Sequence, residues 1–268
     1  EIQDIADFVG DSLALAQKAA TTEADIIVMC GVHFMGETSK ILCPDKKVLV
    51  PDLEATCSLA ESCPADKFAE FVAQHPDHTV ISYVNTTAAT KAVTDIVVTS
   101  SNARQIVESL PQDTPIIFGP DRNLGGYINS ITGRNMLLWD GACHVHEKFS
   151  VEKIIELKNQ YPEAKVLVHP ECKGAVVKLA DKVGSTAALL QYSIKDSANV
   201  FIVATESGIL HEMQKACPEK TFIPAPPSDS TCACNECSYM KLVTMQKLYD
   251  CLLNESPEIH VDEEVAEK

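Results

Sequence analysis

The stretch TPIIFGPDRNLGGYINSITGRNMLLWDGAC, residues 114–143, gives the clearest indication of the fold class. It reads as a buried strand, a turn with Gly, Pro and Asp, a short amphipathic helix and a second apolar strand. It ends in a polar loop that carries Cys143. Strands that alternate with short helices are typical of α/β folds, so this stretch predicts one α/β unit.

The same order of elements occurs twice more in the chain. Residues 24–57 read ADIIVMCGVHFMGETSKILCPDKKVLVPDLEATC, and residues 199–237 read NVFIVATESGILHEMQKACPEKTFIPAPPSDSTCACNEC. Each gives a strand, a turn, a helix, a second strand and a polar loop that contains cysteine. This recurrence indicates that the chain is built from structural repeats.

A second shared block precedes two of these stretches. Residues 80–110 and 166–195 each predict a strand, a helix and a Ser/Thr turn that begins a further helix. In the first copy only the end of the block is present, where Gly10, Asp11 and Ser12 lead into a helix. The chain is therefore predicted to be α/β, with three pseudo-symmetric αβα repeats.

The repeats divide the chain into residues 1–65, 66–150 and 151–268, and the last range includes a C-terminal segment. Residues 144–165 form the longest bridge between repeats and include an amphipathic helical pattern. The first repeat lacks the opening strand of the other two. We therefore expect that strand to lie outside the printed sequence.

Charge and hydropathy exclude several classes of function. The 268 residues include 22 basic and 38 acidic ones, for a net charge of −16. Such an acidic protein is a poor candidate for binding nucleic acid or anionic membranes. The longest apolar runs are strand-length, so no segment is expected to span a bilayer. Anionic substrates would have to be held locally, by helix N-termini, hydroxyls or a metal.

Three loop cysteines occupy equivalent places in the repeats. Cys57, Cys143 and Cys237 lie about 90 residues apart, as the repeat length requires. The odd total of eleven cysteines and their irregular spacing argue against a disulfide framework. Thiolates that converge at one point suit zinc or an iron–sulfur cluster. Three thiolates on a [4Fe-4S] cube would leave one iron open to substrate, as a catalytic zinc keeps an open position.

Spacing alone leaves other metal or redox sites open. Cys232, Cys234 and Cys237 form a CxCxxC run that could hold zinc locally or act as a redox dithiol. Cys172 follows His169-Pro170-Glu171 and resembles a ligand, but it could equally be a bystander. Several remaining cysteines lie in apolar patterns and are expected to be packing residues: Cys30, Cys217 and Cys251.

Hydroxyl residues recur at the predicted helix starts of the repeats: Ser12, Ser100, and Ser185 with Thr186. Hydroxyls and backbone N–H groups at a helix N-terminus can hold phosphate or carboxylate. N-capping is the commoner role of Ser and Thr there. Recurrence in three repeats makes substrate binding and capping about equally good interpretations.

Two predicted strand ends carry polar pairs. Tyr83 and Asn85 could relay a proton and bind a carboxylate or hydroxyl. His169 and Glu171 could act as general acid and base near neutral pH. His146 lies three residues after Cys143 and could sit near the same point. For each of these residues, an ordinary buried structural role is the competing interpretation.

In order along the chain, the sequence carries these motifs: IQDIADFVGDSLALA (2–16), EATC (54–57), YVNTTA (83–88), VTSSNA (98–103), FGPDRNL (118–124), GACHVH (141–146), HPEC (169–172), GSTAAL (184–189) and the CxCxxC run ending at Cys237. They resemble those of the quinolinate synthase family of de novo NAD biosynthesis. The resemblance covers essentially the whole chain. It implies three homologous units around a central [4Fe-4S] cluster with ligands Cys57, Cys143 and Cys237, which sets Cys172 aside.

The resemblance also implies a reaction. The family condenses iminoaspartate with dihydroxyacetone phosphate to give quinolinate, phosphate and two waters, with the free iron as a Lewis acid. Tyr83, His169 and Glu171 are then expected to be catalytic; Glu171 would abstract a proton and His169 would orient a substrate group. The resemblance favours a substrate role for Asn85 and His146. An L-aspartate-oxidising enzyme would supply iminoaspartate, and a reducing cytoplasm would preserve the cluster.

The family also uses a His and a Tyr just upstream of IQDIADF, and the printed sequence begins at Glu1 without them. The chain as printed is therefore expected to be inactive or impaired unless that segment exists outside it. Two other functions remain as alternatives. One is an aconitase-type [4Fe-4S] hydro-lyase, and the other is a non-enzymatic zinc or redox sensor built on CxCxxC.

Overall fold

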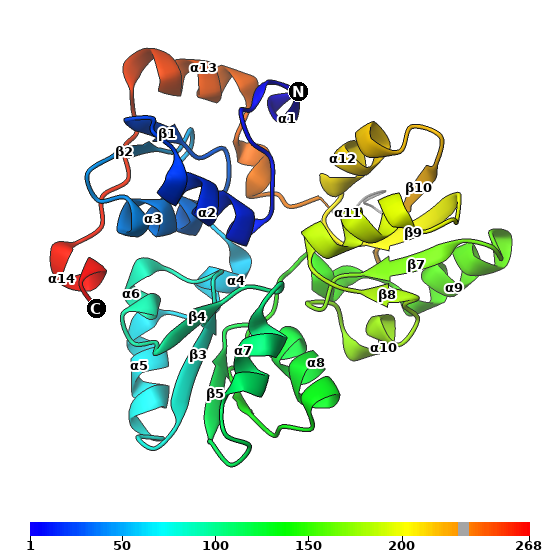
Figure 1. Ribbon diagram of the computed structural model, residues 1–268, viewed down its shortest axis with the longest axis horizontal. Helices are drawn as coiled ribbons and strands as arrows, with labels where there is room; N and C mark the ends of the chain where they lie inside the picture. The colour runs from blue at the N-terminus through cyan, green and yellow to red at the C-terminus, as the bar shows by residue number, and fades with distance from the viewer. Residues whose placement is uncertain (230–235) are drawn as a thin grey trace.

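The computed structural model describes residues 1–229 and 236–268. The chain is α/β, and its named strands form three separate parallel sheets. Figure 1 shows the sheets in three lobes, blue, cyan to green, and yellow, which meet in the middle of the molecule. Parallel strands need crossover connections, and short helices provide them here.

The second sheet contains β3 (Thr79–Tyr83), β4 (Ile96–Val98), β5 (Ile116–Gly119) and β6 (Leu137–Leu138). Its strand order is β4-β3-β5-β6. The stretch 114–143 supplies β5, the helix α8 (Arg122–Thr132) and β6, as its pattern predicts. β3, the first strand of this unit in the chain, lies inside the sheet between β4 and β5.

The third sheet contains β7 (Lys165–Val168), β8 (Lys182–Val183), β9 (Val200–Ala204) and β10 (Thr221–Pro224). Its order is β10-β9-β7-β8, which places its first strand internally, beside its second and third strands. Counted from the first strand of each unit, the second and third sheets have the same order.

The first sheet has two strands, β1 (Ile26–Val28) and β2 (Lys47–Leu49), which pair in parallel. The pairs β5 with β6 and β9 with β10 are parallel as well. The helices that connect and flank all three sheets are α1 (Ile2–Ile5), α2 (Ser12–Thr21), α3 (His33–Leu42), α4 (Ser58–Glu61), α5 (Ala65–Ala73), α6 (Ala88–Lys91), α7 (Ala103–Ser109), α8 (Arg122–Thr132), α9 (Val151–Gln160), α10 (Gly174–Val177), α11 (Thr186–Lys195), α12 (Ile209–Ala216), α13 (Met245–Asn254) and α14 (Glu263–Ala266), with 3-10 turns η1 (His146–Lys148) and η2 (Met240–Leu242).

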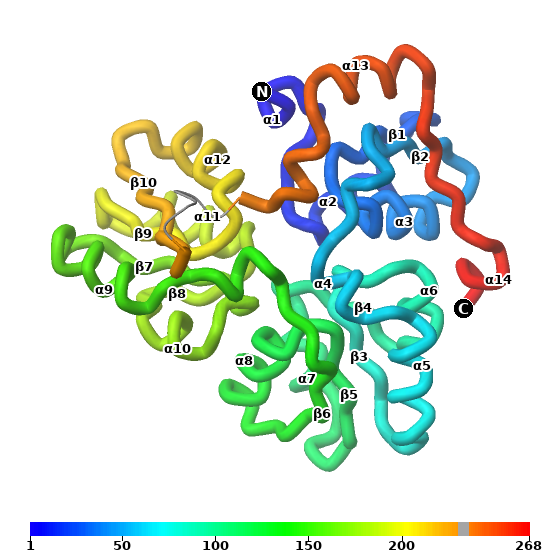
Figure 2. Tube along the Cα trace, turned by 180° about the vertical axis from the view of Figure 1, so that it is seen from behind, coloured from blue at the N-terminus to red at the C-terminus, as the bar shows by residue number. Residues whose placement is uncertain are grey.

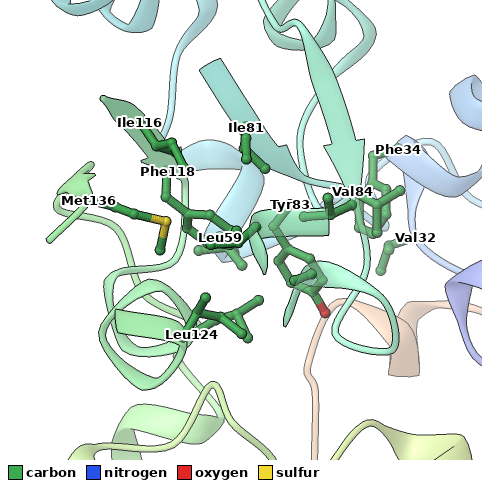
Figure 3. Packing of buried hydrophobic residues seen from close by; sticks show 14 residues of the cluster. Val32, Phe34, Leu59, Ile81, Tyr83, Val84, Ile116, Phe118, Leu124 and Met136 are labelled. Atoms are coloured by element: carbon green, nitrogen blue, oxygen red, sulfur yellow. The ribbon is translucent and has the colours of Figure 1, made fainter. Parts of the chain in front are cut away.

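The largest apolar cluster lies in the second unit and extends to the first (Figure 3). Phe118 and Ile81 are fully buried in it, and each such burial stabilises the fold by roughly 2 kcal/mol. A Cβ at Gly125 would lie 2.6 Å from Leu138 and 2.9 Å from Phe118, so glycine permits α8 to lie close against the sheet. In Figure 3 the Tyr83 hydroxyl points away from these apolar side chains. The cluster therefore holds the Tyr83 ring in place and leaves its hydroxyl free to contact polar groups outside the cluster.

The C-terminal segment returns to the first unit, which the sequence pattern did not indicate. Figure 2 shows the red end of the chain running beside β1 and β2. Leu49 forms an antiparallel bridge with Glu258, and Ile259 packs with Val48 and Val50. Ile259 is 1% exposed, so this part of the C-terminal segment is anchored to the first unit. Among the described residues, no helix is long and apolar enough to cross a membrane.

Candidate active site

Three cysteine loops share one local structure. Each cysteine carbonyl accepts a hydrogen bond from the backbone N–H four residues later: Glu61 to Cys57 at 2.9 Å, Glu147 to Cys143 at 3.0 Å, and Lys241 to Cys237 at 3.1 Å. Each cysteine therefore begins a single helical turn, which leads into α4, η1 or η2. Backbone N–H groups at the start of such a turn point toward the cysteine side chain.

The thiols lie where those N–H groups favour a thiolate. Burial raises the pKa of Cys57 to about 12, raises that of Cys143 well above its usual value, and raises that of Cys237. Two N–H groups oppose this rise at each thiol, always from the second and third residues after the cysteine. The negative charge of Cys237 raises the pKa of Cys57, and that of Cys57 raises the pKa of Cys143, so the three thiols are electrostatically coupled.

Side chains beside the cysteines join the three loops. Ser58 Oγ lies 2.7 Å from His144 Nδ1, although the two residues belong to different units. The His144 ring meets the Tyr239 ring edge-on, with centroids 5.6 Å apart. Tyr239 in turn donates from its hydroxyl to Glu61 Oε2 at 2.8 Å. The loops that carry Cys57, Cys143 and Cys237 therefore contact one another.

Glu171 lies at the centre of a buried polar network next to Cys143. Its Oε1 accepts a hydrogen bond from the Tyr83 hydroxyl at 2.7 Å. Its Oε2 lies 3.1 Å from His146 Nδ1. His169 Nδ1 lies 3.7 Å from Oε1. Ligand atoms of Cys143, His146 and Glu171 all fall within 4.8 Å of one another, so this group can bind metal.

The network separates the pKa values of its members. Burial alone would raise the pKa of Glu171, but His146, His169 and the Tyr83 hydroxyl together lower it to about 2. Burial lowers the pKa of His169 to about 4, although Glu171 opposes the shift. Burial and then the Glu171 charge raise the pKa of Tyr83 well above its usual value. Near neutral pH the site therefore holds an ionised carboxylate, a neutral imidazole and a protonated phenol.

His146 is fixed on both sides of its ring. Its Nε2 lies 3.0 Å from Thr205 Oγ1, and its ring stacks on that of His169 with centroids 4.8 Å apart. His146 and His169 are 7% and 4% exposed. The two rings lie beside the Glu171 carboxylate, and Thr205 orients the ring of His146. No sequence motif pointed to Thr205.

Three helix starts meet beside this network. Asp11 caps α2 by accepting from Ala14 N at 3.0 Å, and Ser185 caps α11 by accepting from Ala188 N at 3.3 Å. Ser101, just before α7, has its hydroxyl 3.0 Å from Asp11 Oδ2 and 2.9 Å from Ser185 Oγ. The helix starts of all three units are thus joined through one hydroxyl.

The other predicted binding residues follow β3 or lie at or near helix starts. The Ser100 hydroxyl lies against that of Tyr83 and acts to lower its pKa. Asn85 follows the end of β3, and its Oδ1 is enclosed without a hydrogen-bond partner among the described residues. Ser12 and Thr186 are the first residues of α2 and α11, one position past the caps. Capping in the first unit is therefore done by Asp11, not by Ser12.

Comparisons with known proteins agree with the motifs. The model of the Quinolinate synthetase A protein family matches residues 1–268. The chain is 59% identical over 264 residues to the quinolinate synthase of Thermosynechococcus vestitus, covering 98% of this chain and 83% of the relative. It is 59% identical over 268 residues to that of Microcystis aeruginosa, covering 100% and 84%. It is 57% identical over 265 residues to that of Chloroherpeton thalassium, covering 99% and 82%.

The chain belongs to the quinolinate synthetase A family. Within its motifs, the structure adds site residues that the sequence did not single out. Asp121, in FGPDRNL, is fully buried, and its Oδ2 has no hydrogen-bond partner among the described residues. Burial, and then the charge of Glu171, raise the pKa of Asp121 well above its usual value. Asn123 donates to the Glu171 carbonyl at 3.0 Å and so supports the same loop. Their place in a motif was the available signal.

The spare cysteines of this family member separate into two groups. Cys172 is 1% exposed, with Sγ 3.4 Å from the Ala204 carbonyl in the core of the third unit. In that place Cys172 packs in the apolar core, which agrees with the interpretation that it is not a ligand. Cys217 and Cys251 are also buried, whereas Cys30 is half-buried. Cys232 and Cys234 lie outside the described residues.

Proposed function

We propose that this protein is a quinolinate synthase, a transferase of NAD biosynthesis. It condenses iminoaspartate with dihydroxyacetone phosphate to give quinolinate, phosphate and two waters. The observation that carries the proposal is the Glu171 network next to Cys143, at the point where the three cysteine loops touch. The 57–59% identity to proteins named quinolinate synthase supports it.

The residues around the thiols fit a [4Fe-4S] cluster with Cys57, Cys143 and Cys237 as ligands. Three loops of the same local structure each bring one thiol and two N–H groups, and hydrogen bonds to sulfur are a means by which proteins tune such clusters. The equivalent loops and strand orders support three pseudo-symmetric repeats around this centre, at residues 1–65, 66–150 and 151–268. When bound, a cluster with three thiolate ligands supplies one Lewis-acidic iron.

Glu171, Tyr83 and His169 would handle the protons of the two dehydrations. The carboxylate of Glu171 is ionised and therefore ready to accept a proton from a substrate carbon. Tyr83 keeps its proton and can donate a hydrogen bond, or the proton itself, to a leaving hydroxyl. Neutral His169 orients a substrate hydroxyl or carboxylate, and His146 holds the Glu171 carboxylate in place.

The helix starts would bind the substrate anions. A protein of net charge −16 has no general attraction for phosphate or carboxylate, so binding must be local. The hydroxyls of Ser12, Ser100, Ser185 and Thr186 lie at or near the N-termini of α2, α7 and α11, where backbone N–H groups favour anions. The enclosed amide oxygen of Asn85 would accept a hydrogen bond from a substrate hydroxyl or imine N–H.

The proposal places the protein in the cytoplasm. An iron–sulfur cluster and free thiols persist in a reducing compartment, and the described cysteines are free. Iminoaspartate would be supplied by an L-aspartate-oxidising enzyme, since its imine carbon has the oxidation level of a dehydrogenated amino acid.

The test is quinolinate formation by the anaerobically purified full-length protein. Iminoaspartate generated in the assay and dihydroxyacetone phosphate should give quinolinate and phosphate in equal amounts. Omission of either substrate should abolish both products. Phosphate release without quinolinate, from protein that carries its cluster, would contradict the proposal.

A further inference from the structure

Lys91 is a buried cation that the proposed chemistry has not used. It ends α6, and its side chain folds back over the turn that follows β3. Its Nζ donates to the carbonyl of Val84 at 2.8 Å, to the carbonyl of Thr86 at 2.5 Å, and to Thr86 Oγ1 at 3.2 Å. All three ammonium hydrogens therefore serve the two residues that flank Asn85.

The position is costly for a cation. Burial lowers the pKa of Lys91 to about 7, and the charges of Glu37 and Cys57 only partly oppose this. Nζ also lies 5.4 Å from the centre of the Phe34 ring, which attracts a cation. A desolvated ammonium is stable in a fold when hydrogen bonds to the protein replace its lost hydration. Here two backbone carbonyls and one hydroxyl provide those hydrogen bonds.

The fold alone does not require a lysine here. In the third unit, α10 follows the end of β7 as α6 follows the end of β3. Alignment of Tyr83-Val84-Asn85 with His169-Pro170-Glu171 puts Val177 opposite Lys91. Val177 packs against the apolar cluster of its own unit. An equivalent turn is therefore built with an apolar side chain where the second unit has an ammonium.

The same turn is held from the first unit as well. Glu37, on α3, accepts a hydrogen bond at its Oε2 from Ala88 N, the first N–H of α6, at 3.0 Å. Glu37 also lies 3.9 Å from His33 Nδ1 in the same helix. Lys91 thus fixes the carbonyl side of the turn, and Glu37 fixes the N–H side. Between these contacts lies Asn85, whose Oδ1 is enclosed without a partner among the described residues.

We propose that Lys91 is a positioning residue for the reaction: its ammonium fixes the carbonyls of Val84 and Thr86 and so holds the Asn85 side chain in the orientation that binds substrate. The inference rests on the proposed function. Misplacement of a binding group by about 1 Å can lower a rate by about a hundredfold, which is the size of effect expected when the brace is removed.

Lys220 offers a matched control. Its Nζ donates to two carbonyls, those of Ser193 and Asp196, each at 2.7 Å, and lies 5.5 Å from the centre of the Phe201 ring. The chemistry is that of Lys91, but the turn belongs to the outer end of the third unit. Lys220→Met should therefore lower stability as Lys91→Met does, and leave kcat/KM within about twofold of wild type.

The experiment compares Lys91→Met, Lys220→Met, Asn85→Ala and the double variant Lys91→Met/Asn85→Ala as anaerobic holoenzymes. Measurements are iron content, thermal midpoint, quinolinate affinity by calorimetry, and kcat and KM. Lys91→Met should keep its iron, bind quinolinate about tenfold to a hundredfold more weakly, and lose about a hundredfold in kcat/KM. The double variant should lose little more than the worse single variant, since Lys91 acts through Asn85.

Two results would overturn the inference. One is a Lys91→Met protein whose kcat/KM and quinolinate affinity match those of Lys220→Met. The other is a double variant whose losses multiply. If Lys91→Met does not fold, Lys91→Gln, which keeps an amide donor and a similar length, replaces it with the same expectations at smaller size. A full-length wild-type protein that makes no quinolinate contradicts the proposed function, whereas an active full-length wild type with these outcomes contradicts only the role of Lys91.

Discussion

The second and third sheets have one strand order and two different kinds of site residue. In each, the first strand is internal and leads to the middle of the molecule. β3 ends at Tyr83 and is followed by Asn85, whereas β7 is followed by His169 and Glu171. The equivalent positions thus carry a phenol and an amide in one unit, and an imidazole and a carboxylate in the other.

What supports these residues differs in the same way. In the third unit, two histidines support the residue after the strand end: His146 and His169 lower the pKa of Glu171, whereas burial would raise it. In the second unit, hydrogen bonds support the turn after the strand: Lys91 donates to the carbonyls on both sides of Asn85. The two sheets thus place the ends of their first strands alike, whereas the side chains that follow those ends differ in chemistry and in support.

The largest effect is expected on kcat, which should distinguish the role of Glu171 from that of Asn85. Glu171→Gln keeps the shape of the side chain but removes the base, so kcat should fall by about a hundredfold to ten-thousandfold with KM little changed. Asn85→Ala removes a binding contact and should mainly raise KM. Glu147→Gln, half-buried and joined to Asn123, serves as the control for loss of a nearby charge and should cost less than about tenfold. Near-normal turnover of Glu171→Gln with an intact cluster would remove it from proton transfer.

Acid should act on the third unit more than on the second. Burial lowers the pKa of His169 from 6.5 to about 4, and the pKa of Glu171 lies at about 2 rather than 4.5. Both groups bind fewer protons folded than unfolded, so the free energy of unfolding falls as pH drops, from 6.5 toward 4 for His169 and from 4.5 toward 2 for Glu171.

The pH effect can be assigned with one variant. Urea midpoints measured at about pH 7 and about pH 5 should fall for wild type, and should fall less for His169→Gln, which has no ring to protonate. An equal fall in both proteins would mean that His169 is not the group that titrates. Comparison with the variant also cancels any loss of cluster common to both.

The smallest effect concerns the hydroxyl that joins the units. Ser101→Ala removes the contacts with Asp11 and Ser185 and should lower the free energy of unfolding by about 1 kcal/mol. Ser109→Ala, at the exposed end of the same helix, is the matched control, since its hydroxyl bonds only within that helix to Ile106. Denaturant midpoints that are lowered equally would show that the link between units adds no stability.

The sequence predicted most elements and singled out four of the residues that lie together at the strand ends. Apolar runs that alternate with helical patterns indicated the strands of all three units, and the motifs indicated Tyr83, His146, His169 and Glu171, which the structure brings together. These signals are local in sequence. Caps were less certain, because Asp11 and Ser12 are both suited to begin a helix, and the backbone geometry decided for Asp11.

Long-range contacts escaped sequence reasoning. Nothing local to Ile259 indicates that it would pack against Val48 in the first unit, since the partner lies at the other end of the chain. Lys91 resembled an ordinary helix-end lysine, and its role depends on the turn that lies beneath it. The role of Thr205 likewise depends on its contact with the His146 ring, which lies far from it in sequence. Such roles follow from tertiary packing, which periodicity does not encode.

Iron and acid-labile sulfide analysis after anaerobic purification tests whether three thiols, one from each unit, hold one [4Fe-4S] cluster. Wild type and Cys172→Ala, whose thiol is buried in the third unit, should each contain about four irons and four sulfides per chain. Cys57→Ala should lose them, although Cys57 is far in sequence from the CxCxxC run. One zinc per chain in wild type, or iron retained in Cys57→Ala, would contradict the account.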